Sequence, residues 1–107
     1  MGQWMLNVRK LQYWWRGFND AVFGGELRPI KIVHGWTGRG VWGWCTSDRE
    51  IIISDKLDED QAMSTLLHEM IHQWQLEHGL EMSHGASFLK WSKTCKSLTG
   101  LQVHWRG

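Results

Sequence analysis

Residues 58–79 of this chain, DEDQAMSTLLHEMIHQWQLEHG, form one long segment with the signals of a helix at both ends. Asp58 is a suitable N-cap, and Gln61 three residues later completes a capping-box pattern. Gly79 is a natural residue to follow the end of a helix, so the pattern predicts a helix that continues to about His78. The predicted buried stripe comprises Ala62, Met63, Leu66, Leu67, Met70, Ile71 and Trp74.

The segments before this helix predict one more helix and a small sheet. Apolar residues at spacings of three and four indicate a first helix over residues 3–23, which Gly24-Gly25 should end. Three short extended runs follow at residues 30–33, 41–45 and 49–53. Only Thr46-Ser47-Asp48 separates the second run from the third, which favours a hairpin.

A last helix is expected from about Gly85 to Gly100. Its predicted buried residues are Phe88, Trp91, Cys95 and Leu98. The chain therefore reads as one α+β domain over residues 1–107, with an N-terminal helix, a small three-stranded sheet and two further helices.

Composition narrows the class of protein. Of the 107 residues, 42% are apolar and 21% are charged, which is typical of a globular domain and not of a disordered chain. No apolar run is long enough to span a membrane, and the first ten residues lack the pattern of a signal peptide. The two cysteines, Cys45 and Cys95, form no CxxC pair and suit a reducing compartment. We therefore expect an intracellular protein, in the cytoplasm or nucleus.

The central helix carries the pattern H-E-x-x-H at residues 68–72. His68 and His72 are four residues apart, so they lie on one helix face and can share one tetrahedral Zn²⁺. Glu69 lies about 100° round the helix, beside that face, where it can take a proton from a water molecule that the metal activates. The pattern therefore predicts a catalytic zinc site with Glu69 as general base.

A catalytic zinc needs a third protein ligand, and two histidines are candidates. His78 follows His72 by six residues, but ligation from there requires a glycine that breaks the helix, and this chain has Gln75 instead. If the helix continues, His78 is rotated about 240° away from His72. His84 follows the Gly79 break and can return to the metal, so helix geometry favours His84.

Three motifs in the right order resemble the SprT-like (Spartan) metallopeptidase family. They are FNDAVFGGEL at residues 18–27, LLHEMIH at residues 66–72 and HGASF at residues 84–88, and the last matches the family's H-G-x-x-F. The resemblance extends from about Leu11 to Trp91. It implies a zincin-like fold with His68, His72 and His84 on zinc and Glu69 as general base.

The resemblance also implies a class of substrate. Proteins of that family cleave proteins, notably those crosslinked to DNA, and DNA often activates them. Many members carry a cysteine-rich zinc ribbon after the protease core, whereas this chain stops at Gly107. We therefore expect a minimal protease core, and weak DNA binding, because that recruiting module is missing.

Two groups of residues are candidates for contacts with nucleic acid. Trp36, Trp42 and Trp44 flank a glycine-rich loop with Arg39, and such aromatics can stack on bases of single-stranded DNA. The competing interpretation is that these tryptophans line the core or the substrate cleft. The second group comprises Lys90, Lys93 and Lys96, which lie on one side of the last helix. These lysines can contact phosphates, although a solvated helix face is the commoner reason for such a run.

The charge distribution bears on the same question. Residues 1–40 carry six basic residues (Lys or Arg) and two acidic ones. Residues 41–85 carry two basic and nine acidic residues, and residues 86–107 carry four basic residues and no acidic one. Both ends are therefore basic, and in the fold they could meet as one positive surface.

The leading interpretation is a zinc metalloprotease with one zinc per chain that acts on DNA-associated or DNA-crosslinked proteins. Its expected partners are a protein substrate and single-stranded DNA, with no membrane. The alternatives are a general zinc peptidase without a DNA link and a zinc-stabilised binding module for DNA or a partner, with little turnover. Glu69 counts against the last alternative, because a structural zinc site has no use for a base.

Overall fold

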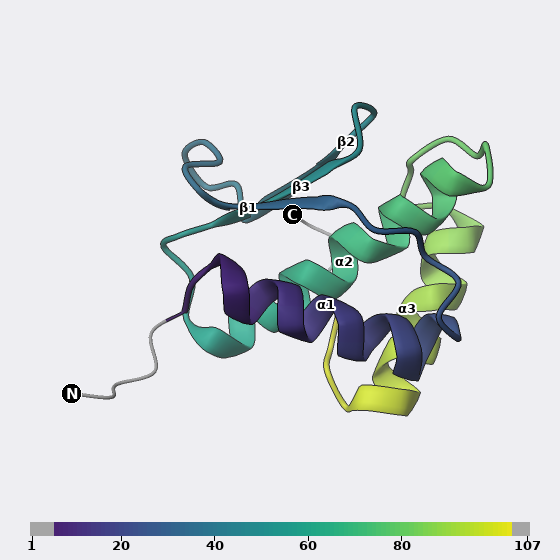
Figure 1. The fold of residues 1–107 in the computed structure, drawn as a ribbon. Coiled ribbons are helices and arrows are strands. Elements are labelled where there is room, and N and C mark those ends of the chain that lie inside the picture. The colour runs from purple at the N-terminus through teal and green to yellow at the C-terminus, as the bar shows by residue number, and fades with distance from the viewer. Residues whose placement is uncertain (1–5, 104–107) are drawn as a thin grey trace.

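The computed structural model describes residues 6–103 and shows the α+β fold that the sequence predicts. Its elements are α1 (Val8–Phe23), β1 (Lys31–Gly35), β2 (Gly43–Thr46), β3 (Glu50–Ser54), α2 (Glu59–Glu77) and α3 (Ala86–Thr99). The sheet has the order β1-β3-β2. Helix α2 runs under the sheet, with α1 and α3 on its other sides (Figure 1).

Helix α1 begins later than predicted. Its N-cap is Asn7, whose side-chain oxygen accepts a hydrogen bond of 3.0 Å from the backbone N–H of Lys10. A side chain of this kind satisfies one of the free amides at a helix start, so Asn7 defines the boundary and the helix starts at Val8. The predicted residues 3–5 lie outside the described part of the chain. Gly24 ends the helix with a φ of 63°, as glycine does readily.

The predicted hairpin is present, and each strand is shifted by one or two residues from its predicted range. Strands β2 and β3 pair antiparallel, with Cys45 opposite Ile51. The turn between them includes Arg49, whose φ of 64° lies in the left-handed region that closes tight turns. Strand β1 pairs with β3 in parallel, so β3 is the central strand and β2 lies at one edge.

Helix α2 is the centre of the molecule. The Asp58 and Gln61 capping box is formed in both directions. The sheet, α1 and α3 all contact α2, so it is buried well beyond the predicted stripe. Within that stripe Met63 and Trp74 are only partly buried, and Ala62, Leu66, Leu67, Met70 and Ile71 are in the core. Polar residues of α2 are buried as well: Ser64, Thr65, His68, Glu69, His72, Gln73 and Gln75.

Helix α3 has the predicted bounds, with Gly85 as N-cap and Gly100 in the left-handed conformation at its end. Phe88 and Cys95 are buried as predicted, and Trp91 is partly buried against the core. The prediction for Leu98 was wrong, because its side chain is 56% exposed. The segment after Gly100 contributes Val103 to the core instead, with 3% of its surface exposed.

Membrane insertion was not expected from the sequence. None of the helices in the described part of the chain combines the length and apolar character that a bilayer crossing requires.

Candidate metal centre

Three histidines from two parts of the chain meet beside α2. His68 and His72 lie one turn apart on that helix, and His84 lies in the loop just before α3. The Nε2 atom of His84 is 3.2 Å from Nε2 of His68 and 3.3 Å from Nε2 of His72. Helix α2 continues past Gln75 to Glu77, and the chain then reverses at Gly79, whose φ is 68°. This reversal returns His84 to the two helix histidines.

The arrangement fits a tetrahedral metal ion. For zinc–nitrogen bonds of about 2.0–2.1 Å, two ligand atoms on a tetrahedron are about 3.3–3.4 Å apart. The Nε2 atom of His84 is 3.2 and 3.3 Å from the other two Nε2 atoms, which is close to that value. Three lone pairs that converge on one point repel one another unless a cation or protons lie between them. His68, His72 and His84 could therefore hold a metal ion.

Phe88 forms a wall of this cluster. Its ring centroid is 4.8 Å from that of His68, 5.2 Å from that of His72 and 4.8 Å from that of His84. Phe88 has no exposed surface, so it closes one side of the histidine cluster to water. His68 is 3% exposed and His72 9%, whereas His84 is exposed, so the cluster opens to solvent on the His84 side.

The protonation of His72 reflects this burial. Burial lowers the pKa of His72, the hydrogen bond to Gln75 opposes that effect, and the charge of His84 lowers the pKa further. The net result is a pKa below the ordinary value, which favours the neutral imidazole. A neutral ring is the form that binds a metal.

Glu69 directly follows His68 on α2, and its side chain lies against strand β2. Its side chain is buried, with 2% of the residue exposed, and burial raises its pKa to about 8. A cation at the three histidines would lower that pKa again, because an opposite charge nearby favours the ionised form. A carboxylate whose pKa lies near neutrality is well matched to the work of a general base.

Gly43 on β2 makes room for Glu69. A Cβ atom on Gly43 would lie 2.8 Å from Thr65 Cγ2, 3.0 Å from the carbonyl oxygen of Ile52 and 3.2 Å from Glu69 Oε2. Strand β2 and helix α2 therefore approach so closely at this point that a glycine is required.

His78, the competing candidate ligand, lies elsewhere. It caps the end of α2, its Nδ1 is 2.8 Å from the carbonyl oxygen of Trp74, and its ring stacks on Trp74 at 4.1 Å between centroids. Its Nε2 is also 3.3 Å from a carboxylate oxygen of Glu26. His78 is thus occupied by contacts at the helix end and is not part of the histidine cluster.

Only some of the residues suggested for nucleic-acid contacts lie close together in the structure. Trp36, Arg39 and Trp42 line a shallow hollow of about 340 Å³, together with Lys56 from the chain after β3. Trp36 is 70% exposed. Trp44 does not line that hollow, and its indole N–H donates a hydrogen bond of 2.8 Å to the carbonyl oxygen of Thr37. The three lysines of the other group, Lys90, Lys93 and Lys96 on α3, are all exposed.

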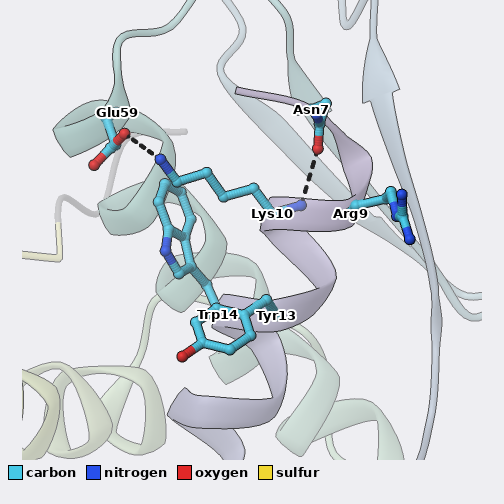
Figure 2. Close-up of a pocket in the computed structure, with 6 residues that line it drawn as sticks. All are labelled: Asn7, Arg9, Lys10, Tyr13, Trp14 and Glu59. Atoms are coloured by element: carbon cyan, nitrogen blue, oxygen red, sulfur yellow. Dashed lines mark hydrogen bonds and ion pairs between the residues drawn. The ribbon is translucent and has the colours of Figure 1, made fainter. Parts of the chain in front are cut away.

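A second aromatic hollow lies along the start of α1. It has a volume of about 810 Å³, and Tyr13, Trp14, Arg9 and Lys10 contribute to its lining. Figure 2 shows the Lys10 ammonium pointing to Glu59. The Lys10 Nζ atom is 2.6 Å from Glu59 Oε2 and lies over the Trp14 ring, 5.3 Å from its centroid. None of the residues lining this hollow belongs to the histidine cluster.

Sequence reasoning missed three residues that shape the site. Phe88 was predicted to be buried, but not to pack against the histidines. Gln75 was noted only because it is not glycine, although its side chain contacts His72. Gly43 carried no signal, since its role depends on a helix that lies far along the chain.

Comparison with known proteins identifies the family to which the chain is similar. A protein-family model described as the SprT-like family matches residues 11–106, which is nearly the whole chain. Comparison with curated proteins gives no match.

Proposed function

The chain belongs to the SprT-like family, and from this premise we propose that it is a zinc-dependent peptidase. The family is associated with metallopeptidase-like activity, and the three histidines could bind a metal. One observation carries the proposal: three histidine Nε2 atoms converge, and a buried glutamate directly follows one of these histidines on α2. A metal site with a purely structural role needs no general base, whereas a catalytic site with an open position does.

Zinc is the metal that we propose for the site. Three imidazole nitrogens at tetrahedral spacing, with the fourth position left for water or substrate, are a common ligand set of catalytic zinc. Calcium and magnesium prefer oxygen ligands, which this cluster lacks. His68, His72 and His84 are the proposed ligands.

The chain's own residues then have distinct tasks. A bound zinc ion would supply Lewis acidity, lowering the pKa of a water molecule from about 15.7 to about 7. In the proposed reaction Glu69 would accept a proton from the attacking water at a carboxylate oxygen and would pass it to the nitrogen of the departing amine. Phe88 keeps bulk water from one side of the histidines, and Gly43 allows Glu69 to lie against β2.

The edge of the sheet suggests how a peptide is held. In the described part of the chain β2 pairs only with β3, so its other edge is available to a further strand. An extended peptide can add to such an edge through main-chain hydrogen bonds. Because Gly43 lies in β2 directly beside Glu69, we propose that a peptide on this edge presents its scissile bond to the base.

The direct test is cleavage of an unfolded protein substrate by the zinc-loaded enzyme. We expect turnover that a chelator abolishes and added zinc restores. Glu69→Gln should retain the fold and the zinc but lose activity by about a hundredfold or more, because only the base is removed. Glu81→Gln, which changes an exposed glutamate outside the cluster, is the matched control. Near wild-type activity in Glu69→Gln would exclude Glu69 as the base.

A second proposal concerns the substrate class: proteins associated with or crosslinked to DNA. The supporting observation is the hollow that brings Trp36 and Trp42 together with Arg39 and Lys56. Aromatic rings with cations between them can stack bases and neutralise phosphates, which favours single strands. The exposed lysines Lys90, Lys93 and Lys96 would add a weaker, salt-dependent attraction.

Binding of single-stranded and duplex DNA should be compared at low and physiological salt. We expect weak binding that prefers single strands and weakens steeply as salt increases. Trp42→Ala should reduce the preference for single strands, whereas changing the three α3 lysines together to glutamate should weaken both forms. No binding at low salt would leave a general zinc peptidase. Binding and zinc uptake without any cleavage would favour a zinc-stabilised binding module.

A further inference from the structure

Gln75 is a fully buried polar residue that the proposed chemistry does not use. It lies on α2 one turn after His72 and has no exposed surface. Its Oε1 is 2.8 Å from His72 Nδ1 and accepts a hydrogen bond of 3.2 Å from the backbone N–H of Ser83. Its Nε2 donates hydrogen bonds of 3.0 Å to the Ser83 carbonyl oxygen and 2.9 Å to Ser87 Oγ. The amide therefore uses both acceptor positions and both donor hydrogens.

These contacts determine which way the amide faces. A backbone N–H can only donate, so the amide atom that faces Ser83 N–H must be the oxygen. The opposite orientation would place the amide NH₂ against Ser83 N–H and the amide oxygen against the Ser83 carbonyl. The arrangement therefore allows one orientation, with Oε1 toward His72.

The orientation of the amide in turn determines the tautomer of His72. An oxygen that can only accept faces Nδ1, so Nδ1 must carry a hydrogen. In the neutral ring, Nε2 then has a free lone pair, and it lies 3.3 Å from Nε2 of His84. A fixed Nδ1–H tautomer leaves Nε2 ready to bind a metal without a proton to displace.

The same amide also holds the residue next to His84. Gln75 bonds both the N–H and the C=O of Ser83, which immediately precedes His84 in the chain. It bonds Ser87 as well, in the first turn of α3. One side chain thus connects a histidine on α2 with the loop that brings the third histidine from 12 residues further along.

We propose that Gln75 is a positioning residue of the metal centre: it selects the tautomer of His72 and holds the loop of His84 at the distance that a shared ion requires. The consequence for metal binding rests on the proposed zinc site. The tautomer and the loop position are properties of the metal-free protein, so they can be tested separately.

The first measurement uses the zinc-free protein. Nitrogen-15 spectra that correlate ring nitrogens with ring hydrogens distinguish the two imidazole tautomers. We expect wild-type His72 to be the Nδ1–H form, Gln75→Leu to give a mixture, and Gln75→Glu to restore the Nδ1–H form because a carboxylate oxygen also accepts. An Nε2–H tautomer in the wild type would overturn the proposal, whether or not any variant folds.

The second measurement is zinc affinity, determined by competition with a chromophoric chelator. Removing a partner that orients a metal-binding histidine typically costs about 10–100-fold in affinity, and we expect Gln75→Leu to fall in that range. Gln73→Leu is the matched control: Gln73 is equally buried on the same helix, but among the described residues it bonds Trp15, Glu77 and the Arg28 carbonyl and none of the three clustered histidines.

The control separates positioning from general loss of stability. Gln73→Leu should lower the melting temperature yet keep zinc affinity within about threefold of the wild type, as expected for a change outside the metal centre. If Gln75→Leu also stays within that range, or if both variants lose affinity equally, the positioning role is wrong. If the wild type binds no zinc, the proposed function fails, while the His72 tautomer still decides the role of Gln75.

Discussion

Replacing Gly43 by alanine is a local test of how the sheet and α2 position the base. The new methyl group would lie 2.8 Å from Thr65 Cγ2 and 3.0 Å from the backbone oxygen of Ile52. Ordinary contacts of a Cβ atom begin at 3.4 Å, so one partner must move by about 0.6 Å (3.4 − 2.8). Thr65 is 4% exposed and β-branched, so its methyl group cannot simply rotate away.

The expected cost follows from that overlap. Overpacking of a tightly filled region typically destabilises by about 1–3 kcal/mol. For a domain of this size each kcal/mol lowers the melting temperature by roughly 4–8 °C, so a decrease of about 4–24 °C is expected. The third contact, at 3.2 Å, is Glu69 Oε2. Because a displacement of 1 Å can cost about a hundredfold in rate, we expect peptidase activity to fall by about tenfold.

The assay is thermal unfolding, zinc content and cleavage rate measured on one preparation. Gly35→Ala is the control, since a Cβ there meets no atom within 4 Å in strand β1. Gly43→Ala should retain zinc, because none of the three histidines lies on β2. If Gly43→Ala matched Gly35→Ala in both melting temperature and rate, the close approach of β2 to the base would have no functional meaning.

Two further predictions concern titratable groups. Burial raises the pKa of Glu77, but hydrogen bonds from Gln73, a backbone amide and Arg49 outweigh it and leave the pKa below its ordinary value. Ionised Glu77 therefore stabilises the fold at neutral pH, and this stabilisation is lost as pH falls through the lowered pKa. Glu77→Gln should cost about 1–3 kcal/mol at pH 7 and give a less steep loss of melting temperature in acid. Burial raises the pKa of both Cys45 and Cys95 to about 12, and the charge of Glu69 adds to this effect at Cys45. At about pH 8 both thiols should therefore alkylate at least about a hundredfold more slowly in the folded than in the unfolded protein.

Local signals in the sequence predicted much of the fold. The capping box at Asp58 and the glycines at positions 79 and 100 can be recognised from neighbouring residues in the sequence. The helices that they delimit, α2 and α3, are present in the structure. The spacing of His68 and His72 likewise needs only helix geometry. Periodicity alone placed the start of α1 too early, because Asn7 caps the helix and Val8 is its first residue.

Contacts between distant segments were beyond those signals. The parallel pairing of β1 with β3 depends on how the hairpin folds back. Leu98 fits the spacing of the buried residues of α3, but its side chain in the last turn is exposed. Val103, after the helix, fills the core instead. The role of Gly43 arises from Thr65 and Glu69 on α2, 22 and 26 residues further along the chain. The role of Gln75 arises from Ser83, in the loop beyond the end of the helix. Only the three-dimensional arrangement reveals these contacts.

The zinc content of the folded protein is the sharpest test of the three-histidine metal centre. Protein purified without chelators should contain about one zinc per chain by elemental analysis, because the three histidines form one ligand set. His84→Ala should lose that zinc, whereas His78→Ala, which changes a histidine bound to the end of α2, should retain it. A folded wild type without stoichiometric metal, or a His84→Ala variant that keeps its zinc while His78→Ala loses it, would contradict the account.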